Sequence, residues 1–303
     1  MKPSAPRGKR RLIATAAAVV GLLVPAGPAL AAPGATAPAA SSTADNPRHI
    51  TVEGVLNFRD AGGYATDQGR MKRGVLYRSG ALQKTTDAGL RTLTKLGLSK
   101  VVDFRSAHEL AGAPDRLPSG VEAVSRPVEA SDQLSSFADI LALTPAEQEK
   151  LLGDGGAEGI MLDSGRKFVT DPERRAQFGK ALRDIAGSGK GATLVHCSGG
   201  RDRTAWLVAI VQTALGVSRS DVVADYLQSN TELVGWRASV LKQLTDAGME
   251  KPELVTPLLD VREAYLQASF DQAVASYGSF RAFVHEGLGI DDATLAKLRS
   301  RLV

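Results

Sequence analysis

Short apolar runs alternate with glycine turns over residues 50–77 of this 303-residue chain. The apolar pairs Val55–Leu56 and Leu76–Tyr77 are separated by the turn residues Gly62–Gly63 and Gly69. Glycine adopts the positive φ angles that tight turns require. This segment is therefore predicted to form short strands joined by tight turns.

A helix and two apolar strands follow at positions that favour a parallel sheet. Residues 86–96 repeat leucine at helical spacing and stop before Gly97, while residues 100–104 and 192–196 are short runs rich in β-branched residues. A strand that follows a helix in this way is typical of parallel strands joined by a crossover. The predicted fold class is α/β, with a mostly parallel central sheet flanked by helices.

The two predicted strands are separated by nearly ninety residues, too many for a plain loop in a compact domain. Residues 134–152 show helical periodicity, residues 153–159 are glycine-rich and are expected to be mobile, and Asp171–Pro172 opens a helix that ends near Gly187. We expect a helical insertion over about 126–190. It either packs on the sheet or covers, as a lid, a site at the end of the second strand.

The last third of the chain is predicted to be helical. Residues 205–215 are apolar on all sides, which indicates a buried central helix. Further helices are expected at residues 221–227, 234–244, 258–275, 280–286 and 293–302.

The N-terminal residues have the pattern of an export signal. Five basic residues precede the apolar run 12–24, and Ala29–Leu30–Ala31 supplies a small-x-small cleavage site. Thirteen apolar residues cannot cross a bilayer core, which needs about 20. We expect a signal peptide over residues 1–31, a disordered linker over 32–47, a single domain over 48–303, and a secreted product without stable membrane insertion.

Removal of the predicted signal changes the charge of the protein. Five of the 37 basic residues and none of the 33 acidic ones lie in it, so the formal net charge falls from +4 to −1. The basic character of the whole chain therefore gives no reason to expect nucleic-acid binding. The chain also has a single cysteine, so no intramolecular disulfide is possible.

The candidate chemistry lies between His196 and Thr204, where the sequence reads HCSGGRDRT. A loop between a strand and a helix N-terminus directs backbone N–H groups at one point, which makes an anion site. The two glycines permit the tight curl that such a loop needs. We expect a substrate phosphate to be bound by Ser198, Gly199, Gly200, Arg201, Arg203 and Thr204.

Cys197 is the candidate nucleophile of this site. A neutral thiol is a weak nucleophile, but the loop N–H groups, the helix dipole and Arg203 all stabilise the thiolate. The planar guanidinium of Arg203 can hold two phosphoryl oxygens at once. Attack would give a phosphocysteine intermediate that water then hydrolyses, a chemistry that needs no metal or cofactor.

Departure of an alkoxide or phenolate also requires a proton donor. Asp202 adjoins the loop arginine, and the rival carboxylic acids are Asp103, Asp115, Asp163 and Asp171. His196 is expected to lie behind the loop and to fix it by hydrogen bonds. Arg201 either stays in solvent or contacts a substrate phosphate or carboxylate.

The loop resembles the H-C-x-x-G-x-x-R-T signature of cysteine-dependent protein tyrosine phosphatases. Its G-R-D-R-T ending is similar to the G-K-D-R-T of the secreted bacterial tyrosine and lipid phosphatases related to mycobacterial PtpB. Further agreement lies in Asn57–Gly63 (N-F-R-D-x-G-G), Leu76–Ser79 (L-x-R-S) and Val102–Ser106 (D-L-R-S), and in segments 225–230 and 277–280. The resemblance spans about residues 51–302.

This resemblance implies a cysteine-phosphatase fold with a helical lid, and it implies roles for three residues. Cys197 would be the nucleophile, Arg203 the phosphate binder and Asp202 the acid, because the family carries its acid in the loop and no Trp-Pro-Asp occurs here. Family members accept phosphotyrosine, and some accept phosphoserine, phosphothreonine or phosphoinositides. The expected partner is thus a phosphorylated protein or phospholipid. Arg201 replaces the family's usual lysine, so lipid preference does not transfer directly.

Two other functions compete with a tyrosine phosphatase. A rhodanese-like sulfurtransferase also cradles a cysteine in a loop closed by a helix, but its loop is one residue shorter than Cys197–Arg203 requires. A non-catalytic phosphate-binding module would not need a cysteine, an arginine and an acid together.

Overall fold

The computed structural model describes residues 48–131 and 136–303. The predicted signal peptide and linker lie outside these residues. A five-stranded sheet has the order β1-β4-β7-β5-β6, in which β1 is antiparallel to β4 and all other neighbours are parallel. Its strands are β1 (Arg59–Asp60), β4 (Leu76–Ser79), β5 (Leu98–Asp103), β6 (Glu122–Ser125) and β7 (Ala192–His196). The predicted mostly parallel α/β sheet is confirmed.

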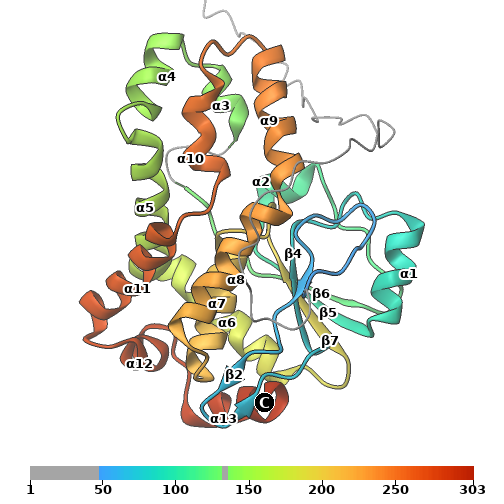
Figure 1. The fold of residues 1–303 in the computed structure, drawn as a ribbon. Coiled ribbons are helices and arrows are strands. Elements are labelled where there is room, and N and C mark those ends of the chain that lie inside the picture. Colours follow the sequence, from blue (N-terminus) through green and yellow to red (C-terminus); the bar gives the residue numbers. More distant parts are fainter. Residues whose placement is uncertain (1–47, 132–135) are drawn as a thin grey trace, which may run out of the picture. The chain divides into compact units, whose positions relative to one another are not determined.

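Side chains of the central strand β7 alternate between two apolar layers. Ala192 and Leu194 pack in a cluster with Leu93 of α1 (Asp87–Lys95), whereas Val195 packs in the main core on the opposite face. The main core is supplied by α6 (Pro172–Gly187), α7 (Arg203–Ala214), α11 (Glu263–Tyr277) and α13 (Asp292–Leu302). Figure 1 shows α1 on one side of the strands and α6 and α7 on the other. Burial on both faces explains why this strand is mostly apolar, with Thr193 and His196 as its buried polar residues.

A small hairpin lies outside this sheet. It pairs β2 (Ala65–Thr66) with β3 (Gly69–Arg70) in antiparallel register. Together with β1 and β4 it confirms the predicted series of short strands and tight turns in residues 50–77.

Local signals explain where two of the predicted helices begin. The Thr86 hydroxyl accepts a hydrogen bond from the Gly89 N–H at 3.1 Å, which caps α1. Asp171 caps α6 in the same way, accepting from the N–H groups of Glu173 and Arg174 at 2.9 and 3.0 Å. Both caps satisfy N–H groups that have no partner within their helix.

The predicted insertion contains α3 (Phe137–Leu141), α4 (Pro145–Leu152), α5 (Gly156–Thr170) and α6, and a short α2 (Ala107–Ala111) precedes β6. The helical periodicity over residues 134–152 corresponds, within the described residues 136–152, to two helices, α3 and α4, with a break between Leu141 and Pro145. Pro145 disfavours a helical conformation in the residue before it, and Thr144 is extended at ψ 156°. Thr144 instead forms a capping box with Glu147, so α4 starts anew.

Of residues 153–159, which are expected to be mobile by composition, residues 156–159 form the first turn of α5. Each glycine in a helix interior lowers helix stability by about 1 kcal/mol relative to alanine, so favourable packing must offset this loss. Gly165 of α5 provides such packing, since a Cβ there would lie 2.8 Å from the carbonyl oxygen of Tyr265 on α11.

The last third of the chain is helical, as predicted. Besides α7, α11 and α13, it contains α8 (Arg219–Glu232), α9 (Val234–Asp246), η1 (Pro252–Val255), α10 (Thr256–Leu259), α12 (Phe280–Ala282) and η2 (Phe283–Gly287). One helix over 258–275 was expected, but the chain is extended between α10 and α11. There Asn230 accepts from the Val261 N–H at 2.9 Å and donates to its carbonyl at 2.7 Å, which holds Val261 out of a helix.

A second apolar cluster lies among α3, α4, α5, α9, η1 and α10 (Figure 1). Its buried members are Ile140, Leu152, Ala157, Ile160, Val240, Leu244, Met249, Val255, Leu258 and Leu259. The N-terminal part of the predicted insertion therefore packs on the C-terminal helices. Within residues 48–131 and 136–303, we find no helix with the length and apolar composition needed to traverse a membrane.

Candidate active site

The loop between β7 and α7 is a tight turn that starts at the end of a central strand. Its first residue, Cys197, is 2% exposed. Gly200 has φ +66°, and a Cβ there would lie 2.2 Å from the backbone oxygen of Ser79, so only glycine fits. Because α7 begins at Arg203, the positive end of its dipole lies at the loop.

The carbonyl groups of this loop are bound from the outside. The Asn57 side chain donates from Nδ2 to the carbonyl oxygens of Gly199 and Gly200 at 3.0 and 3.1 Å. Arg78 donates from Nη2 to the same Gly200 oxygen at 2.9 Å. In a trans peptide the N–H points opposite to the C=O, so the N–H groups of Gly200 and Arg201 are turned to the inside. The inner surface of the loop is therefore lined by donors, as an oxyanion requires.

A buried charged cluster holds these bracing residues in place. Arg78 donates to Asp225 Oδ2 at 2.5 Å, and Arg59 donates to the Asp225 carbonyl at 2.8 Å and to Asn57 Oδ1. Burial would raise the pKa of Asp225, but the charges of Arg59 and Arg78 outweigh it and lower that pKa. Burial and the nearby charge of Arg78 lower the pKa of Arg59 to about 10. Two guanidinium groups and one carboxylate leave net positive charge behind the loop.

Arg203 is 4% exposed and held in one orientation. Its Nη1 donates to the carbonyls of Phe104 and Val128 at 3.2 and 3.0 Å and to Glu109 Oε2 at 2.6 Å. Its Nη2 donates to Glu109 Oε1 at 2.7 Å. These bonds use the Nη1–Nη2 end of the guanidinium, which leaves the Nε–Nη2 edge for two phosphoryl oxygens.

Glu109 connects α2 to the phosphate loop. Besides its bonds with Arg203, it accepts from the Ser198 hydroxyl at 2.5 Å and from the Ser106 N–H at 2.9 Å. Burial would raise the pKa of Glu109, but the hydrogen bonds and charge of Arg203 outweigh it and lower that pKa to about 2. Burial would likewise lower the pKa of Arg203, and the bonds to Glu109 together with the charge of Cys197 raise it instead. The pair is thus ionised over the whole physiological pH range.

Arg201 joins the loop to the second apolar cluster. Its Nη2 donates to the Leu258 carbonyl of α10 at 2.7 Å and to Asp202 Oδ2 at 3.1 Å. Its guanidinium lies 5.6 Å from the centre of the Trp236 ring on α9, and the residue is 9% exposed. The alternative of an arginine free in solvent is therefore wrong, and its contact with a substrate phosphate stays a prediction.

The remaining residues predicted to bind phosphate are Ser198, Gly199, Gly200 and Thr204, and their contact with a phosphate stays a prediction. Ser198 is bonded to Glu109, the carbonyls of Gly199 and Gly200 are braced as described, and Thr204 is fully buried in the first turn of α7. The rival acids are engaged elsewhere. Asp163 pairs with Lys167 at 2.7 Å, Asp171 caps α6, and Asp103 and Asp115 each lie 2.8 Å from Arg105.

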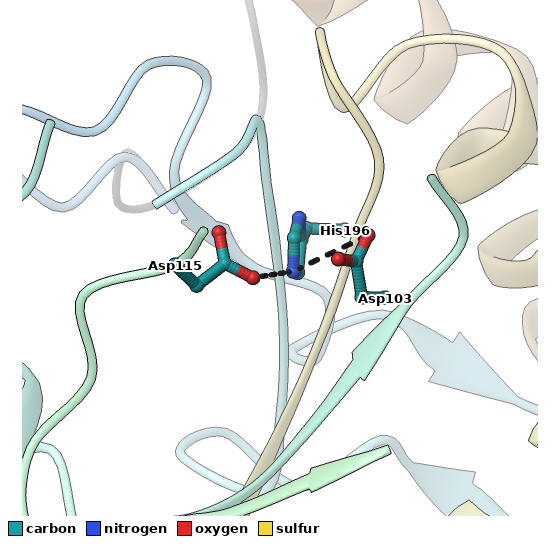
Figure 2. Close-up of side chains that lie close together, drawn as sticks. All are labelled: Asp103, Asp115 and His196. Carbon is teal, nitrogen blue, oxygen red and sulfur yellow. Dashed lines mark ion pairs between the residues drawn. The ribbon is translucent and has the colours of Figure 1, made fainter. Parts of the chain in front are cut away.

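His196 lies in a buried charged cluster behind the loop, as predicted. Its Nε2 is 3.0 Å from Asp115 Oδ2 and 3.7 Å from Asp103 Oδ1, and Figure 2 shows both carboxylates beside the imidazole. Its Nδ1 is 3.2 Å from the carbonyl oxygen of Cys197. His196 therefore joins the end of β7 to the two carboxylates behind the loop.

Asp103, Asp115 and His196 also have the donor types of a metal site, with ligand atoms within 4.8 Å of one another. The Arg105 guanidinium, however, lies 2.8 Å from a carboxylate oxygen of each aspartate. A cation at this point would compete with a charge that the chain already supplies. The residues fit an ion-pair network better than a metal site.

Four residues of the site were not singled out from the sequence: Asn57, Arg78, Glu109 and Asp225. Three of them lie in segments noted only for their resemblance, and none has a local signal of contact with the loop. Glu109 forms a capping box with Ser106, which the sequence pattern indicates as a helix start. That pattern does not predict the bond between Glu109 and Arg203.

Comparison with known proteins bears on this geometry. The profile of the tyrosine phosphatase family matches residues 50–303. The triple specificity protein phosphatase PtpB of Mycobacterium tuberculosis is 32% identical over 278 residues, covering 83% of this chain and 98% of PtpB. A protein of Cupriavidus necator, named provisionally as a tyrosine-protein phosphatase, is 34% identical over 263 residues, covering 86% of this chain and 90% of its own.

Among solved structures, TpbA of P. aeruginosa is similar to this chain at 17% sequence identity and a TM-score of 0.27. The alignment covers 58% of this chain and 90% of the TpbA chain. The family assignment depends instead on the profile match and on the two relatives that align over most of their length. The residues around the loop at Cys197 thus belong to a protein tyrosine phosphatase, and the chain is a member of the tyrosine phosphatase family.

Proposed function

We propose that this protein is a secreted, cysteine-dependent phosphatase that hydrolyses phosphotyrosine monoesters through a phosphocysteine intermediate. The observation that carries the proposal is the loop from Cys197 to Arg203. Asn57 and Arg78 bind the loop carbonyls from outside, so the N–H groups of the loop are turned inward. Glu109 fixes the guanidinium of Arg203, which leaves its Nε–Nη2 edge for the phosphate. Such a cradle stabilises an oxyanion without further reorganisation.

In the first step the Cys197 thiolate attacks phosphorus. The Sγ–P bond forms while the bond from phosphorus to the tyrosine oxygen breaks. Arg203 and the loop N–H groups hold the three equatorial oxygens, and protonated Asp202 gives its proton to the departing phenolate. The products of this step are tyrosine and a phosphocysteine.

In the second step water attacks the phosphocysteine. The Asp202 carboxylate, left by the first step, accepts a proton from the attacking water. The P–O bond forms, the Sγ–P bond breaks, and inorganic phosphate leaves with the thiolate restored. One carboxyl group thus serves as acid and then as base.

The proposed substrate range centres on phosphotyrosine. PtpB is named a triple specificity phosphatase, which supports testing phosphoserine, phosphothreonine and phosphoinositides as secondary substrates. In this chain Arg201 is engaged by Leu258 and Asp202. Binding of a second phosphate by Arg201 would have to break those bonds, so we propose that phosphoinositides are the poorer substrates.

Export is proposed from the N-terminal sequence alone. Basic residues, a short apolar run and Ala29–Leu30–Ala31 are in the order that signal peptidase requires. N-terminal sequencing of protein from the culture medium should begin near Ala32.

Replacing Asp202 with alanine should reduce turnover in proportion to the basicity of the leaving group. For phosphotyrosine, loss of the acid should lower kcat/KM by about 10² to 10³, within the range that general acids contribute. For 4-nitrophenyl phosphate the loss should be small, because nitrophenolate leaves without a proton. Equal losses on both substrates would remove Asp202 from the role of acid.

The mature chain should hydrolyse a phosphotyrosine peptide in the presence of a metal chelator. A panel of phosphotyrosine, phosphoserine and phosphoinositide substrates measures the order of preference, and acid quenching during turnover should trap phosphate on Cys197. Inactivity in chelator, or turnover of thiosulfate in place of phosphomonoesters, would contradict the proposed chemistry.

A further inference from the structure

A cavity of about 20 Å³ adjoins Asp202. It is lined by residues of α5, α7, α8 and α11, and α5 and α11 run side by side in Figure 1. Among its lining residues are Asp202 and Trp206, one helical turn apart, together with the polar residues Ser164, Tyr226 and Ser269. Cys197 is not among the lining residues.

Two lining residues each have a buried polar atom without a hydrogen-bond partner. These atoms are Oδ1 of Asp202 and Nε1 of Trp206. Buried polar atoms in folded proteins are nearly always hydrogen-bonded, and each exception calls for a ligand, an ion or a water molecule. Here the two atoms are complementary, since a carboxylate oxygen accepts and an indole N–H donates.

The size and lining of the cavity select its occupant. One water molecule needs about 10 to 15 Å³ and two to four polar partners, and a volume of about 20 Å³ matches a single water molecule. A water can accept from the Trp206 N–H and donate to Asp202 Oδ1, which satisfies both atoms at once. We propose that one ordered water molecule occupies this cavity and bridges Asp202 to Trp206.

This water would set the orientation of the proposed acid, so the inference rests on the proposed function of Asp202. The second carboxylate oxygen, Oδ2, lies 3.1 Å from Arg201. Anchoring Oδ1 in the cavity leaves Oδ2 as the oxygen that exchanges a proton with the leaving group and with water. Trp206 is then a positioning residue that acts through the water and never touches the substrate.

Replacing Trp206 with phenylalanine removes the N–H donor and keeps an aromatic ring. We expect kcat/KM for phosphotyrosine to fall roughly tenfold, a part of the full contribution of the acid, and kcat/KM for 4-nitrophenyl phosphate to change less than about threefold. A merely structural role would lower both values equally, and that result would overturn the proposal.

The matched control is Phe280→Leu. Phe280 lies 6.4 Å from the Trp206 ring, centre to centre, and is not among the cavity-lining residues, so this change loosens the same aromatic cluster but keeps the indole N–H. It should lower both activities by the same small factor. A selective loss for phosphotyrosine in Phe280→Leu would show that loosened packing is the cause and would overturn the role of the water.

Asp202→Ala separates this inference from the proposed function. If Asp202→Ala shows no dependence on the leaving group, the acid assignment fails. If it does and Trp206→Phe does not, only the water bridge fails. Should Trp206→Phe not fold, a crystal structure of the unchanged protein decides: an electron-density peak within hydrogen-bond distance of Oδ1 and Nε1 supports the bridge, and an empty cavity overturns it.

Discussion

Replacing Cys197 with serine should abolish turnover of phosphotyrosine and leave the binding of phosphate intact. A serine hydroxyl stays neutral at pH 7 and is not activated by the loop, so we expect kcat to fall on the order of 10⁴-fold or more. The donors of the cradle are unchanged. The Cys197→Ser variant also lacks the negative thiolate beside the bound anion, so its Kd for inorganic phosphate should equal or fall below the inhibition constant of the unchanged enzyme.

Two measurements decide this prediction. Turnover is followed with a phosphotyrosine peptide, and phosphate binding is measured by titration calorimetry, with Cys197→Ala as a second variant that lacks any nucleophile. Retention of more than about one per cent of the activity by both variants would contradict the assignment of Cys197. Loss of phosphate binding would indicate instead that the loop has collapsed.

Replacing Arg203 with lysine should lower kcat/KM on the order of 10³-fold, the loss expected when a major oxyanion donor is removed. Lysine keeps the charge but cannot hold two oxygens in one plane, nor can it reach Glu109, Phe104 and Val128 together as Arg203 does. Steady-state kinetics with phosphotyrosine measures the effect. A loss below about tenfold would show that charge alone suffices.

Glu109→Gln is the companion variant, because it keeps the shape of the side chain and removes its charge. Arg203 would then be held less firmly, and we expect kcat/KM to fall about tenfold with the loop still folded. The low pKa of Glu109, about 2, also predicts a pH dependence of stability. A carboxyl group with a lowered pKa contributes stability that is complete above its unfolded pKa, about 4.3, and is lost as the pH falls toward 2.

Urea unfolding at pH 7 and pH 3 tests this stability difference. The unchanged protein should lose free energy of unfolding between these values, and Glu109→Gln should lose less of it. Equal losses in both proteins would show that the pair with Arg203 does not contribute.

The framework of the site could be predicted from the sequence because its signals are local. The β-branched run before Cys197 and the apolar run after Arg203 indicate the strand and the buried helix, and both are found. Helix N-caps such as Asp171 could likewise be predicted from the sequence. Pro145 also indicates a break in the helix before it. Helical periodicity on both sides of Pro145, however, made the start of α4 difficult to recognise.

The contacts that orient the site could not be predicted in this way. Glu109 and Arg203 are 94 positions apart, and Asn57 lies 143 positions from the loop glycine that it braces. No periodicity relates residues at such distances, and only the folded domain brings their segments together. The engagement of Arg201 by Leu258 likewise depends on how α10 packs on the second apolar cluster.

The solitary, buried Cys197 determines how the protein recovers from oxidation. Peroxide converts a thiolate to a sulfenic acid, which another thiol of the same chain can ordinarily capture as a disulfide before further oxidation. No such thiol exists in this sequence. An oxidised Cys197 must be reduced by a thiol from another molecule or close a ring with a backbone nitrogen, and otherwise it proceeds to the sulfinic acid and permanent inactivation.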